Sequence, residues 1–158
     1  MNSSHSTLLH STCLSLSHTD QTLSYQALCT LFETDRRADL VSALIERHHW
    51  TLNKAERAID EYLMFLFVAA QPSNLPLVPT ANVDCVWEAD ILQNTAQYIQ
   101  TCDRFCGRII HHSSATALKK AATFDSIERA FSDTQTLLSQ RFGTEAAPLS
   151  DAAACGLL

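Results

Sequence analysis

The chain has little glycine and proline for its length. Only three glycines and four prolines occur among 158 residues, which leaves little material for the many tight turns of an all-β domain. Hydrophobic residues make up 46% of the chain and charged residues 18%, a composition typical of a globular protein. A chain of this length can form one domain with a substantial core. We therefore predict a single all-α domain, a bundle of about five helices.

Clustered basic charge is also lacking. The chain has 11 Lys and Arg against 17 Asp and Glu, for a net charge of -6. A surface that binds nucleic acid needs clustered Lys and Arg to neutralise phosphates. The two basic pairs, Arg36–Arg37 and Lys119–Lys120, are typical of solvated helix surface. We expect no nucleic-acid partner.

Long apolar runs and a basic leader are absent from the sequence as well. Residues 1–24 contain no Lys or Arg and are rich in Ser, Thr and His, unlike a secretory signal. The longest apolar run, residues 62–70, is about half of a bilayer span. The six cysteines are scattered, which favours reduced thiols over a disulfide scaffold. We expect a soluble, cytoplasmic protein with no membrane partner and a flexible polar N-terminus over residues 1–24.

Apolar residues recur at helical spacing in several stretches. Thr51 or Asn53 can cap the third of the helices that this pattern predicts, while Gly107 and Gly143 end the fourth and the last. The predicted helices cover residues 25–33, 35–49, 54–70, 82–105 and 118–142.

An extended connection separates the third and fourth predicted helices. Residues 71–80 contain three of the four prolines, and proline disfavours helix in the residue before it. The leucines and the valine of this segment indicate that it lies on the core. The helical domain is predicted to span residues 25–145, followed by a loose tail over residues 146–158.

Four segments resemble one known family. They read EYLMFL, LVPTANVDCVW, YIQTCDRFCGRIIHH and AFSDTQTLLSQRFG, at residues 61–66, 77–87, 98–112 and 130–143. Their order and spacing resemble the helical region of the glycine-rich domain protein family, which includes plant proteins and small bacterial relatives. The resemblance covers roughly residues 40–148 and implies an all-helical region of unassigned activity.

The chain departs from this family at two places. In the relatives the tryptophan is typically followed by His-x-His, whereas here Trp87 is followed by Glu88 and Asp90. The glycine-rich tail of the family is reduced to AACGLL at residues 153–158. The resemblance therefore implies nothing for this chain about properties that depend on those histidines or on that tail.

Three carboxylates surround Trp87. Asp84 and Glu88 are four residues apart and share a helix face, whereas Glu88 and Asp90 do not. On a helical wheel Trp87, Ile91 and Tyr98 form one apolar stripe, so we predict that Trp87 is buried. Asp90 is predicted to lie on a different, polar side, where its replacement by alanine has almost no effect on stability.

Two histidines could join the carboxylates. If the segment after Gly107 folds back over the start of this helix, His111 or His112 completes a site with Asp84 and Glu88. Two carboxylates with one or two imidazoles suit a divalent transition metal.

A structural interpretation of the same residues stays open. Asp84 lies in the first turn of its helix, where a carboxylate stabilises free backbone N–H groups. Glu88 could pair with Arg104 or Arg108, and the two histidines could be an ordinary loop pair.

The cysteines offer a weaker pattern. Cys102 and Cys106 are four residues apart and precede the histidine pair, so a Cys2His zinc site is conceivable, although small thiols also fit tight helix packing. Cys85 adjoins Asp84, and a neighbouring carboxylate disfavours the thiolate that a nucleophile requires.

The sequence leaves two functions open. The first is a small helical module that binds a protein partner and has no established cofactor. The second is a metal-binding protein or metal-dependent enzyme that uses Asp84, Glu88 and His111 or His112. Catalytic residues and oligomeric state stay unassigned.

Overall fold

A computed structural model of the chain describes residues 24–33, 35–72, 75–113, 123–143 and 150. This part of the chain is all-α, as predicted. Its helices are α1 (Tyr25–Phe32), α2 (Asp35–His48), α3 (Leu52–Ala70), α4 (Ala81–Gln93), α5 (Thr95–Cys106) and α7 (Phe124–Phe142). None of these helices is both long and apolar enough to span a bilayer. Residues 1–23 of the predicted N-terminus and, apart from Ser150, the predicted tail lie outside the described residues.

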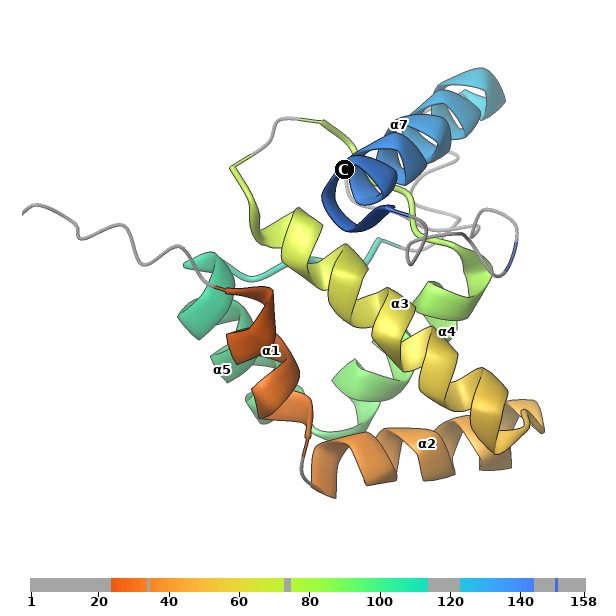
Figure 1. Cartoon of the computed structure of the whole chain (residues 1–158), viewed down its shortest axis with the longest axis vertical. Helices are drawn as coiled ribbons and strands as arrows, with labels where there is room; N and C mark the ends of the chain where they lie inside the picture. Colours follow the sequence, from red (N-terminus) through yellow and green to blue (C-terminus); the bar gives the residue numbers. More distant parts are fainter. Residues whose placement is uncertain (1–23, 34, 73–74, 114–122, 144–149, 151–158) are drawn as a thin grey trace, which may run out of the picture.

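Helix α3 is the centre of the bundle. Figure 1 shows it running through the middle of the molecule, and α1, α2, α4, α5 and α7 all pack against it. Every residue from Glu61 to Ala69 is buried, as expected for a helix that is covered on all sides. Phe65 of α3 packs against Trp87 of α4, with ring centroids 5.6 Å apart.

Polar side chains and glycines set the helix ends. The Thr51 hydroxyl accepts a hydrogen bond from a backbone N–H at the start of α3, and Thr80 does the same for α4. Gly107 and Gly143 follow α5 and α7 with φ of 61° and 64°, where glycine avoids the strain of a left-handed backbone. The predicted ends at both glycines are confirmed, and of the two predicted candidates for the α3 cap, Thr51 and Asn53, the structure has Thr51.

The single helix predicted over residues 82–105 is wrong, because the chain breaks at Asn94. This residue has φ of -153° and ψ of 84°, and its side-chain oxygen accepts the backbone N–H of Gln97. Asparagine is among the best N-cap residues, so it starts α5 in a new direction. The break lets α5 pack on both α3 and α4.

The proline-rich connection lies partly on the core, as predicted. Leu77 and Val78 are only 3% and 2% exposed. The Val78 N–H donates to the Thr134 hydroxyl of α7 over 3.0 Å, which ties the connection to the last helix. In the described residues the last helix begins at Phe124, and Lys119–Lys120 lie outside them.

A buried ion pair overturns two predictions. Arg36 of α2 and Asp90 of α4 are 6% and 3% exposed, so Arg36 is not solvated and Asp90 is not on a polar surface. The Arg36 guanidinium donates to both Asp90 oxygens over 2.6–2.9 Å and to the Thr101 hydroxyl over 2.8 Å. It also stacks 3.9 Å from the centroid of the Phe32 ring. The Tyr62 hydroxyl donates to Asp90 over 2.9 Å, so this one network joins five helices.

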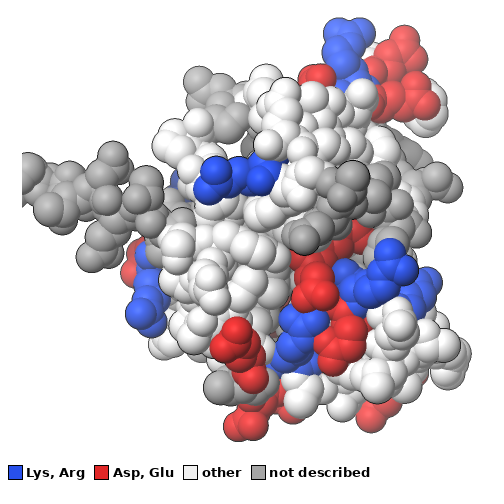
Figure 2. Space-filling view, in the orientation of Figure 1, with Lys and Arg blue, Asp and Glu red and all other residues white. Residues whose placement is uncertain are grey.

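Arg37, by contrast, is only partly buried, with a side chain that is 25% exposed. It pairs with Glu56 over 2.6 Å and with Asp60 over 2.7 Å, which links α2 to α3. Figure 2 shows acidic and basic side chains side by side on the lower part of the face shown. Exposed pairs of this kind contribute little to stability, about 0–1 kcal/mol each.

Candidate metal-binding site

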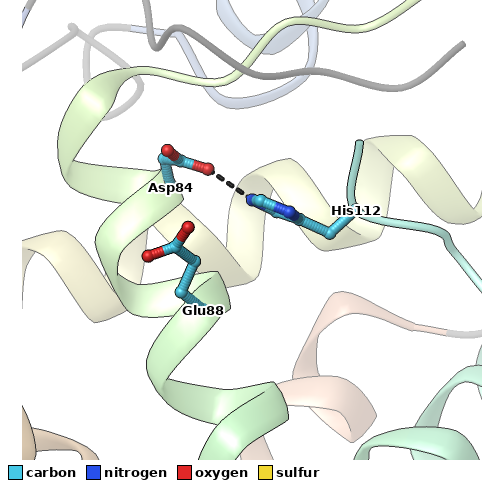
Figure 3. A group of neighbouring side chains, drawn as sticks. All are labelled: Asp84, Glu88 and His112. Carbon is cyan, nitrogen blue, oxygen red and sulfur yellow. Dashed lines mark hydrogen bonds and ion pairs between the residues drawn. The ribbon is translucent and has the colours of Figure 1, made fainter. Parts of the chain in front are cut away.

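Three potential metal ligands meet where the chain folds back over the start of α4. Asp84 and Glu88 project from α4, and His112 projects from the segment that follows α5 (Figure 3). We call residues 107–113 the strap. One donor atom from each of the three side chains lies within 4.8 Å of the others. Within the described ranges, no other group of three or more His, Cys, Asp or Glu side chains converges in this way.

The local sequence explains how these side chains come together. The Thr80 cap starts α4 at Ala81, which places Asp84 and Glu88 on consecutive turns of one face. Gly107 turns the chain at the end of α5, and the fully buried Ile110 anchors the strap on the core. The ring of His112, two residues later, then reaches α4.

His112 and Asp84 form the shortest contact of the site. The His112 Nε2 atom lies 2.6 Å from a carboxylate oxygen of Asp84, and the two side chains are 15% and 22% exposed. This hydrogen bond raises the pKa of His112 above its ordinary value, burial opposes the rise, and the negative charges of Asp84 and Glu88 add to it. Protonated His112 is therefore held in a charge-assisted hydrogen bond.

Trp87 forms the inner wall of the site. Its side chain is fully buried, which confirms the prediction, and the His112 ring meets it edge-on with centroids 4.9 Å apart. The indole N–H donates to the Tyr98 hydroxyl over 2.9 Å, and Tyr98 donates in turn to the Ile110 carbonyl. A chain of hydrogen bonds thus connects α4, α5 and the strap directly behind the ligand cluster.

The structure separates the other predicted site residues from this cluster. His111 is exposed and is not part of it, since adjacent residues of an extended segment point to opposite sides. Arg104 and Arg108 form no ion pair with Glu88 among the described contacts, and Arg108 donates instead to the Ala69 carbonyl over 3.1 Å. Glu88 stays exposed at the mouth of the site.

The cysteines do not build a zinc site with the histidines. Cys102 and Cys106 lie one turn apart on α5, but no His joins them in a donor cluster within the described residues. The pKa of Cys85 is raised by burial and by the charges of Asp84 and Glu88. This direction agrees with the expectation that Cys85 is not an activated nucleophile.

Reasoning from the sequence missed the role of Tyr98. Its ring fell in the predicted apolar stripe, but the partners of its hydroxyl come from Trp87 and Ile110. A tyrosine in an apolar stripe is the only sequence signal, because a buried hydroxyl must find a hydrogen-bond partner.

Comparisons of the chain with protein-family models, with curated proteins and with solved structures found no match.

Proposed function

We propose that the chain is a small helical binding module whose ligand is one divalent transition metal ion, held by Asp84, Glu88 and His112. The observation that carries the proposal is the convergence within 4.8 Å of donors from α4 and from a segment 28 residues away. Two carboxylates and one imidazole form a ligand set of intermediate hardness, suited to Zn, Mn, Fe, Co or Ni. Three protein ligands leave coordination positions open for water or a further ligand.

The geometry requires only a small adjustment to bind an ion. Metal–oxygen and metal–nitrogen bonds are about 2.0–2.2 Å long, so ligands on one ion lie closer together than the 4.8 Å limit within which these donors fall. Glu88 is exposed and can change rotamer to close the site. His112 and Asp84 are already adjacent, at 2.6 Å.

Binding must compete with a proton. The ion replaces the proton on His112, because a metal-bound imidazole is neutral. The raised pKa of His112 therefore makes the apparent affinity fall as the pH is lowered below that pKa. The resemblance to the glycine-rich domain family is a separate prediction and does not support this ligand set. In those relatives two histidines follow the tryptophan, whereas here Glu88 and Asp90 do.

Calorimetric titration of the untagged full-length chain with Zn²⁺ and Ni²⁺ tests the proposal. We expect one ion per chain for the wild type, and a loss of about tenfold or more in affinity for His112→Gln and for Asp84→Asn. His111→Gln is the matched control, because it removes the adjacent, exposed imidazole and should leave the affinity unchanged. Titration of the wild type without a saturable one-to-one event would overturn the proposal, as would equal losses for the two histidine variants.

Intrinsic fluorescence supplies a second readout. The chain contains two tryptophans, and only Trp87 contacts His112. In a Trp50→Phe background, Ni²⁺ bound at this site should quench the remaining emission, while Zn²⁺ should compete with the quenching. Quenching that persists in His112→Gln would show that the ion binds at a different site.

A further inference from the structure

Tyr98 of α5 connects the strap to the helix that carries the two carboxylates. Its hydroxyl accepts a hydrogen bond from the Trp87 indole N–H over 2.9 Å and donates one to the Ile110 carbonyl. Trp87 and Ile110 are fully buried, and Tyr98 is only 3% exposed. Buried polar groups keep their partners because an unsatisfied one is costly. The two hydrogen bonds therefore fix the middle of the strap relative to α4.

The Trp87 indole contacts the His112 ring as well as Tyr98. The two rings meet edge-on, with centroids 4.9 Å apart. Through the Tyr98 hydroxyl, the same indole also holds the carbonyl of Ile110, two residues before His112. Residues two apart in an extended segment point to the same side. Once Ile110 is fixed, the His112 ring is therefore directed at α4, where its Nε2 atom lies 2.6 Å from Asp84.

A second side chain of the strap holds its beginning. The Arg108 guanidinium donates to the Ala69 carbonyl of α3 over 3.1 Å. Arg108 precedes His112 by four residues, so this contact fixes where the strap starts but leaves the direction of the imidazole open. The hydrogen bond from Tyr98 acts closer to the ligand, and it also refers the strap to α4, the helix on which the other two ligands lie.

We propose that Tyr98 is a positioning residue for the ligand cluster, and that its two hydrogen bonds hold His112 beside Asp84 before any ion binds. An ion then meets two of its three ligands in place, and the exposed Glu88 closes the site. A preorganised site binds more tightly, because less conformational freedom is lost on binding. The effect on an ion rests on the proposed function, whereas the placement of His112 by Tyr98 does not.

Nuclear Overhauser effects between the ring protons of His112 and Trp87 test the placement in the metal-free, full-length protein. We expect Tyr98→Phe to weaken or abolish them. The matched control is Tyr62→Phe, which makes the same change at a fully buried tyrosine whose hydroxyl donates to Asp90, nearer the other end of α4. This control should keep the wild-type intensity. Wild-type intensity in Tyr98→Phe, or an equal loss in both variants, would overturn the inference.

Calorimetric titration with Zn²⁺ tests the effect on the ion, under conditions where urea denaturation shows every variant to be folded. Tyr98→Phe should lower the affinity by about tenfold or more, as changes to groups that orient metal ligands typically do, and Tyr62→Phe should leave it unchanged. In a His112→Gln background Tyr98→Phe should have no further effect, because the ligand that it positions is gone. A loss of affinity that persists in this background would indicate a merely structural role and overturn the inference, as would wild-type affinity in Tyr98→Phe.

The wild type offers a measurement that depends on no variant. In the metal-free protein the Trp87 indole N–H should exchange with solvent far more slowly than that of free tryptophan, because it is buried and hydrogen-bonded to Tyr98. Exchange as fast as in free tryptophan, or protection that arises only after Zn²⁺ is added, would overturn the inference. Loss of the ring contacts in Tyr98→Phe, in a protein whose wild type binds no Zn²⁺, would support the placement of His112 and reject the proposed function.

Discussion

Replacing Asp90 by alanine should strongly destabilise the protein. The Asp90 carboxylate accepts hydrogen bonds from Arg36 and from the Tyr62 hydroxyl inside the core. Its removal leaves the Arg36 guanidinium, which is 6% exposed, without its countercharge. Arginine cannot avoid this cost by losing a proton.

The size of the expected loss in stability follows from the burial of the Arg36–Asp90 pair. Breaking a buried ion pair by removing one partner typically costs about 3–5 kcal/mol, because an uncompensated charge stays in the core. The Tyr62 hydroxyl also loses its acceptor, and an unsatisfied buried donor adds about 1–3 kcal/mol. We expect a loss of at least about 3 kcal/mol in the free energy of unfolding, a large part of the about 5–15 kcal/mol available to a typical domain.

Urea denaturation followed by circular dichroism measures this loss directly. Asp103→Ala is the control, since Asp103 is an exposed carboxylate on α5, and it should change the free energy of unfolding by less than about 0.5 kcal/mol. The double variant Arg36→Met with Asp90→Leu should recover most of the loss, because apolar residues of similar size remove both buried charges. An Asp90→Ala protein as stable as the control would refute the assignment of a buried network and restore the view of Asp90 as a polar surface residue.

Further predictions concern Trp87, Tyr98 and His112. Trp87→Ala should cost about 3–5 kcal/mol in urea denaturation as a large-to-small core change, and an unchanged midpoint would contradict its burial. Tyr98→Phe should cost about 1–3 kcal/mol, because the Trp87 N–H and a strap carbonyl lose their common partner; a loss below about 0.5 kcal/mol, as for an ordinary surface substitution, would refute this chain of hydrogen bonds. The folded-state pKa of His112 is raised, so its ion pair with Asp84 stabilises fully below the unfolded pKa of about 6.5. This stability is lost as the pH rises through the folded pKa. With chelator present, the wild type should therefore exceed His112→Gln in unfolding free energy more at pH about 5.5 than at pH about 8.5, and a difference that does not change with pH would reject the ion pair.

The sequence predicts the elements of this fold better than their contacts. Helical periodicity, the Thr51 cap and the glycines after α5 and α7 are local signals, and each was interpreted correctly. Asn94 carries a local signal too, but it lies within an uninterrupted helical pattern. An asparagine inside such a pattern starts a new helix only if the new direction buries more surface, and this depends on α3, which is distant in the sequence.

The buried pair Arg36–Asp90 could not be predicted by the same means. The two residues are 54 positions apart, and a helical wheel assigns a charged residue to a face without showing what covers that face. The relation of Asp84 to Glu88, by contrast, depends only on helix geometry, so their shared face could be predicted. The choice between His111 and His112 depended on which side of the strap faces α4, and this follows from the burial of Ile110 in the core.

At each end of α4 an aspartate pairs with a cationic side chain, but the two pairs differ in burial and in whether the cation can lose its proton. Near its C-terminus Asp90 holds Arg36, a permanent cation that is nearly removed from solvent, so the contact cannot be exchanged and acts as a structural link. Near its N-terminus Asp84 holds His112, a cation that can lose its proton and is 15% exposed. Under the proposed function, a metal ion replaces that proton while the carboxylate stays in place, and the exposed Glu88 is the third ligand. The end of α4 that carries a titratable contact is therefore where we propose that an ion binds.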